Sequence, residues 1–200
     1  MASRTAVANL ALGHFGQYRI DDIDERTPTA EAVRDCWDIC QDSVLRAHHW
    51  NFATAIAVLT QLATAPVFGW TYQWTLPSDF LKLVSCNDVF SGVRDTEFTV
   101  RGGVLCTREN KAQIEYVKRI TACELWDPQF VEAFALKLAE MVAPRLSLSG
   151  GKAADLADRA RRAGASAAHS DAIDSRPHVR RAEDGSRYHQ AIRGWDPDIG

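Results

Sequence analysis

The sequence predicts an α+β protein that is mainly α: a helical bundle with an inserted small antiparallel β region and an extended C-terminal tail. Four segments place apolar residues at three- and four-residue steps, the spacing of one helix face. Residues 53–121 are instead rich in Val, Ile, Thr and aromatic residues and are broken by prolines and glycines. Residues 176–200 sustain neither period. We therefore expect one domain over 1–175 and a separate C-terminal segment over 176–200.

Two helices are expected before the β region. The first covers about residues 3–15, with Ser3 as its cap. The second covers about residues 30–48, after Thr27 and Pro28, which suit a helix cap and a first helical turn. It is the clearest amphipathic helix in the chain, and its apolar side consists of Val33, Cys36, Trp37, Cys40, Val44 and Ala47.

The β region is expected to contain a hairpin. The runs 96–101 and 104–107 flank Gly102-Gly103, and glycine supplies without strain the positive φ that a two-residue hairpin turn needs. Residues 112–117 alternate apolar and polar side chains, which predicts a third strand.

Two more helices follow, over about 128–148 and 152–175. Asp127-Pro128 provides a cap and a first-turn proline for the earlier one, and Pro144 should kink it near its end. The later helix has mostly alanine on its inner face. Alanine buries little area, so this helix should depend on its neighbours for stability.

Composition limits the classes of protein to which this chain can belong. The chain has 200 residues, a formal net charge of -3 and a sequence pI near 6.1, which argues against a protein whose main task is coating nucleic acid. No apolar run reaches the length of about 18–20 residues that crosses a bilayer, and the first residues lack a signal-peptide pattern, so we expect synthesis in the cytoplasm and no membrane. The five scattered cysteines are expected to be free, buried thiols.

Three patterns suggest chemistry, and each has a plainer explanation. Cys36 and Cys40 share a helix face near His48 and His49, but the spacing does not fit a zinc knuckle, and core packing is the better interpretation. The His pair ends a helix, where polar rings favour the terminal carbonyls.

A second pattern, residues 147–152, places Gly-Gly-Lys before a helix but lacks the first glycine and the final Ser or Thr of a phosphate-binding loop. The third, Asp21-Asp22 with Asp24-Glu25, could supply paired carboxylates but lies in a polar loop. We therefore expect no catalytic residues, no cofactor, no metal and no enzyme activity.

The C-terminal segment 176–200 mixes arginine with aromatic residues. That mixture is used at interfaces, although a solubilising terminus explains it equally well on motif grounds.

Several segments, in a fixed order, resemble one known family. They are Ala11-Leu12-Gly13-His14-Phe15-Gly16, Trp50-Asn51-Phe52-Ala53, Phe68-Gly69-Trp70, the run 72–81, the run 116–119, and 126–130 leading into 134–139. Together these segments resemble the head-to-tail adaptor proteins of tailed phages, of the tail tubular protein A type. The similarity spans about residues 3–175, and the helix after Gly151 departs from the family in being richer in Ala and Arg.

The resemblance implies a structural virion protein at the head–tail junction. Such a subunit joins a dodecameric ring under the portal protein, meets a downstream tail or nozzle protein, and extends a channel through which genomic DNA passes without specific binding. In this family the C-terminal segment grips the portal. The residues that the resemblance assigns to portal docking are Arg176, Arg180, Arg181, Arg187, Tyr188 and Arg193.

Two other functions stay open at the level of sequence. A tail-associated murein hydrolase would use the acidic loop, and a DNA-binding packaging protein would use the arginine-rich C-terminal part. Cell-wall turbidity and a salt-dependent gel shift distinguish them from the adaptor.

Overall fold

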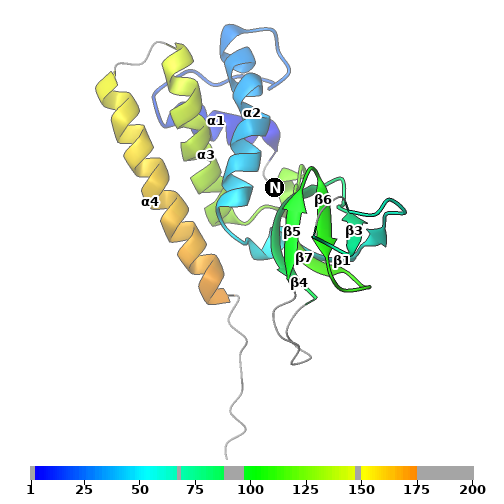
Figure 1. The fold of residues 1–200 in the computed structure, drawn as a ribbon. Helices are drawn as coiled ribbons and strands as arrows, with labels where there is room; N and C mark the ends of the chain where they lie inside the picture. The colour runs from blue at the N-terminus through cyan, green and yellow to red at the C-terminus, as the bar shows by residue number, and fades with distance from the viewer. Residues whose placement is uncertain (1–2, 67–68, 88–96, 147–149, 175–200) are drawn as a thin grey trace, which may run out of the picture.

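The computed structural model describes residues 3–66, 69–87, 97–146 and 150–174 (Figure 1). Within these residues the chain forms four α-helices and seven strands, and Figure 1 shows the helices on one side and the strands on the other. The predicted helical bundle with a small β region is wrong, because the strands build two antiparallel sheets that enclose a core of their own. The predicted C-terminal tail lies outside the described residues.

The helical layer consists of α1 (Arg4–Gly13), α2 (Pro28–Ala47), α3 (Pro128–Val142) and α4 (Gly150–Asp174). Helix α3 packs against the other three, and Figure 1 shows it between α2 and α4. The expected caps form: Ser3, Thr27 and Asp127 each accept a hydrogen bond from a backbone N–H of the first turn.

Helix α3 ends six residues before the predicted end at 148. The chain continues from Val142 into a 3-10 turn, η4 (Ala143–Leu146). Pro144 accounts for the change, because proline has no N–H to donate and its ring clashes with the preceding helical turn.

The strands are β1 (Thr54–Val58), β2 (Thr60–Gln61), β3 (Tyr72–Thr75), β4 (Phe80–Cys86), β5 (Phe98–Arg101), β6 (Val104–Thr107) and β7 (Gln113–Lys118). Sheet A has the order β1-β7-β4, and sheet B has the order β2-β3-β6-β5. The predicted hairpin joins β5 to β6 through Gly102 and Gly103, whose φ angles are +57° and +78°. The third strand does not join that hairpin, because β7 pairs with β1 and β4 in the other sheet.

Two hydrophobic cores result. The larger lies among the helices and reaches sheet A through Leu81 of β4 and Val117 of β7. It contains an aromatic cluster made of Trp37, Trp50, Phe52, Trp126, Phe130 and Phe134. The smaller lies in the β part and includes Leu59, Trp74, Leu105, Ile114 and Tyr116. Segments that carry the family resemblance therefore supply core residues to both parts.

The helical part and the β part are connected by the polypeptide chain and also by polar contacts between side chains and backbone. The buried Gln41 side chain of α2 donates from Nε2 to the Ile120 carbonyl at 2.7 Å, just after β7. Arg119 pairs with Asp42, and Arg46 donates to the Leu81 carbonyl of β4. These contacts fix one end of α2 against sheet A.

Candidate functional site

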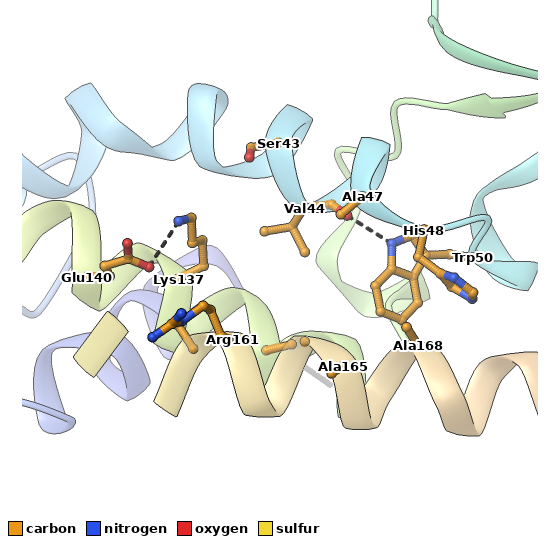
Figure 2. Close-up of a pocket in the computed structure, with 13 residues that line it drawn as sticks. Ser43, Val44, Ala47, His48, Trp50, Lys137, Glu140, Arg161, Ala165 and Ala168 are labelled. Carbon is orange, nitrogen blue, oxygen red and sulfur yellow. Dashed lines mark hydrogen bonds and ion pairs between the residues drawn. The ribbon is translucent and has the colours of Figure 1, made fainter. Parts of the chain in front are cut away.

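A groove of about 350 Å³ lies between α2, α3 and α4 (Figure 2). It exists because all but one of the residues that α4 presents there are alanine or glycine, which leave the space between helices unfilled; the exception is Arg161. The lining residues are Ser43, Val44, Ala47, His48, Trp50, Ala133, Lys137, Glu140, Ala160, Arg161, Gly164, Ala165 and Ala168.

The two ends of this α2/α3/α4 groove differ in chemistry. At one end Lys137 Nζ and Glu140 Oε2 form an ion pair at 3.0 Å, and Arg161 lies nearby (Figure 2). Arg161 is itself paired with Asp158, which does not line the groove. At the other end lies Trp50, whose indole N–H donates to the Val44 carbonyl at 3.0 Å. An apolar floor with charged groups at one end suits an apolar side chain that is followed by a polar or charged group.

A polar clamp, formed by Asp171 with His48 and Asn51, lies beside the Trp50 end of the groove. His48 Nε2 lies 3.0 Å from Asp171 Oδ2 of α4. The Asn51 backbone N–H donates to Asp171 Oδ1, and the Asn51 side-chain amide donates to the Asp171 carbonyl, both at 3.0 Å. His48 was expected to favour the carbonyls that end its own helix. Its ring instead contacts α4 and helps to hold that helix in place.

Strand β1 presents a second candidate surface. It is the last strand of sheet A, so among the described residues only one of its edges is paired. Its outward side chains are large and β-branched: Ile56 is 69% exposed and Val58 is 80% exposed. The inward positions are Ala55 and Ala57, which pack against the core between the sheets. An open edge with exposed apolar side chains is a site that a further strand can cover.

The acidic loop does not provide the paired carboxylates of a glycosidase. Glu25 accepts hydrogen bonds from the Thr27 hydroxyl and from the backbone N–H groups of Asp21 and Asp22. These bonds lower the pKa of Glu25, whereas a general acid needs a raised pKa. The loop is a structural turn that leads into the cap of α2.

The cysteines of α2 face the core. Cys36 and Cys40 are both buried, and burial raises the pKa of Cys40 to about 12. Cys36 donates to the Met141 carbonyl across the α2–α3 contact, at an Sγ–O distance of 3.8 Å. Over the described ranges, no three His, Cys, Asp or Glu side chains come together as metal ligands, and no helix is long and apolar enough to cross a membrane.

The groove and the open edge were not predicted from the sequence. The alanine-rich inner face of the last helix was predicted only to bury little area and to depend on neighbouring helices for stability. Strand β1 alternates small residues, which face inward, with large apolar residues, which face outward. From the sequence alone the large residues would be placed in the core, because the pairing of the strand is not known. The predicted docking residues Arg176, Arg180, Arg181, Arg187, Tyr188 and Arg193 lie outside the described residues.

Comparison with known proteins adds no relative. No family model matches the sequence, and no curated protein matches it.

Proposed function

We propose that this chain is a structural subunit of a tailed phage, a head-to-tail adaptor that assembles into a dodecameric ring under the portal. The ring joins the head to a downstream tail or nozzle protein and extends the channel through which genomic DNA passes. The proposal starts from the sequence segments that resemble the adaptor family and that occur in the same order along the chain. The protein would act at the head–tail junction of the virion.

The observation that carries the proposal is the open edge of β1. Ile56 and Val58 lie on an edge strand, where natural proteins place charges or proline to prevent association. A subunit that works only as part of a larger assembly has a use for such an edge. A contact between β1 and a different surface of the next copy is a heterologous contact, and repetition of a heterologous contact closes into a ring when the rotation between neighbouring copies is a whole fraction of a turn.

The C-terminal segment is the second part of the proposal. We assign portal docking to 176–193, with Arg180, Arg181, Arg187 and Tyr188 as anchors, because arginine and tyrosine are typical of the residues that dominate binding energy at interfaces.

The test is reconstitution with the cognate portal protein, followed by negative-stain microscopy and sedimentation. We expect rings on the portal with the parent chain. We expect no rings with the double substitution Ile56→Lys and Val58→Lys, because two ammonium groups at the contact cannot be buried without partners. The matched control is Tyr18→Lys, since Tyr18 is 92% exposed but lies in the acidic loop, away from β1.

Deletion of 176–200 separates the two parts of the proposal. It should abolish portal binding and leave the folded domain intact. A parent chain that stays monomeric beside its portal, or a deletion that binds the portal as before, contradicts the adaptor role.

A further inference from the structure

The α2/α3/α4 groove is open in the described chain and has the chemistry of a docking site for a short peptide segment. Its floor is apolar, from Val44, Ala47 and Trp50, and its far end carries the ammonium of Lys137 and the guanidinium of Arg161. Each of these cations has an acidic neighbour, but an ammonium has three N–H donors and a guanidinium has five, so each can hold a second carboxylate. The groove therefore favours an apolar side chain next to acidic ones.

The last residues of the sequence have that composition. Residues 194–199 read Gly-Trp-Asp-Pro-Asp-Ile, with a large apolar side chain at each side of two carboxylates. The rest of the C-terminal segment is arginine-rich, and its one acidic pair, Glu183-Asp184, has no large apolar residue next to it.

Chain length allows this segment to reach the groove of its own molecule. The described chain ends at Asp174, six residues beyond Ala168, which lines the groove, so about 9 Å of helix separates the two. The far end of the groove, at Arg161, is about 20 Å back along α4. The 20 residues 175–194 can span at most about 66–72 Å, which is more than enough for the return path.

We propose that residues 194–199 dock into the α2/α3/α4 groove of the same chain, with Trp195 over the apolar floor and Asp196 and Asp198 toward Lys137 and Arg161. A tether of this length raises the effective concentration of the segment at its own groove into the millimolar range, which favours the intramolecular site over a second copy. The proposal does not depend on the adaptor role.

A groove-filling substitution tests the proposal without removing any part of the chain. A Cβ added at Gly164 meets no atom within 4 Å, so Gly164→Leu places its side chain in the open groove and replaces glycine by a better helix former. The matched control is Ala154→Leu, at an exposed position of α4 that does not line the groove.

The measurement is NMR of the ¹⁵N-labelled full chain. We expect the Trp195 indole N–H and the amides of 194–199 to show the same tumbling as α4 in the parent chain and in Ala154→Leu, and to shift and lose that tumbling in Gly164→Leu. A synthetic peptide of residues 190–200 should bind a chain that ends at residue 189, and Trp195→Ala in the peptide should weaken that binding at least tenfold.

Three results would overturn the proposal. The first is a set of 194–199 signals that Gly164→Leu leaves unchanged, in a variant whose circular dichroism matches that of the parent. The second is a loss of ordered signals on dilution together with a dimer mass in sedimentation, which assigns the segment to a second copy. The third is equal binding of the parent and Trp195→Ala peptides.

Discussion

Phe130 is fully buried where three parts of the chain meet. Its ring centroid lies 5.0 Å from that of Trp50, 5.0 Å from that of Phe52 and 5.1 Å from that of Trp126. Trp50 and Phe52 belong to the segment that leaves α2 for β1, and Trp126 immediately precedes the capped start of α3. Edge-to-face contacts of this kind add to the hydrophobic free energy of burial. Phe130 thus fixes the junction between the helices and the sheets.

We expect Phe130→Ala to lower the free energy of unfolding by about 3–5 kcal/mol, because it removes a fully buried ring and leaves a cavity. Urea unfolding followed by circular dichroism measures the loss. Leu125→Ala is the control, since Leu125 is 63% exposed and its substitution should change the free energy by less than about 0.5 kcal/mol. A similar effect for both variants would contradict the role assigned to Phe130.

The buried thiol of Cys40 makes the stability of the fold decrease at alkaline pH. Burial raises its pKa to about 12 from the ordinary value of about 9. Above pH 9 the unfolded chain loses the thiol proton while the folded chain keeps it, so the unfolded state binds fewer protons and stability falls as pH rises toward 12.

We therefore predict that the parent chain loses stability between pH 9 and pH 11 by up to about 1.4 kcal/mol per pH unit from this thiol. Cys40→Ala removes the group. The stability difference between parent and variant, measured by urea unfolding at pH 8, 9 and 10, should shrink as pH rises. A difference that stays constant across this range would show that Cys40 does not titrate differently in the two states.

At the scale of elements, α4 depends on a few contacts. Among its described side chains the buried ones are Leu156, Ala160 and Ala167, so its apolar burial is small for a helix of 25 residues. The clamp of Asp171 with His48 and Asn51 compensates near its C-terminal end.

We expect Asp171→Ala to speed amide hydrogen exchange over residues 165–174 by about tenfold. The estimate follows because several hydrogen bonds are lost, each worth about 0.5–1.5 kcal/mol net, and 1.4 kcal/mol corresponds to a factor of ten. Asp174→Ala, at an exposed position of the same helix, is the control. Faster exchange along all of α4, or none at its end, would argue against a local clamp.

The helices could be located from the sequence because their signals are local. Thr27-Pro28 and Asp127-Pro128 combine a cap with a first-turn proline, and each precedes a long apolar stripe. The arrangement of the strands could not be predicted from the sequence, because it depends on which strands pair across many residues. For example, β1 pairs with β7, about 60 residues later in the chain. The groove was missed for a related reason, since it arises where three helices fail to fill a space. No single helix carries that signal.

At the scale of the whole molecule, the two cores could unfold separately or together. The contacts that cross between them favour a single transition. Gln41 is 2% exposed, and separation of the parts would leave its amide without the Ile120 carbonyl. The chain also crosses between the parts twice, before β1 and after β7, so neither part is a free terminal unit.

A substitution in the smaller core distinguishes the two cases. Leu105 is fully buried and belongs to the smaller core, not to the helical one, so Leu105→Ala should cost about 2–5 kcal/mol. If the parts unfold together, circular dichroism at 222 nm, which reports on the helices, should shift its urea midpoint by the same amount as the NMR signal of the Trp74 indole N–H, which reports on the smaller core. A Trp74 transition that moves to lower urea while the helical signal stays at the parent midpoint would mean that the sheets unfold on their own. In that case the contacts of Gln41 and Arg119 do not couple the cores, and a contact made at β1 would not be transmitted to the helices.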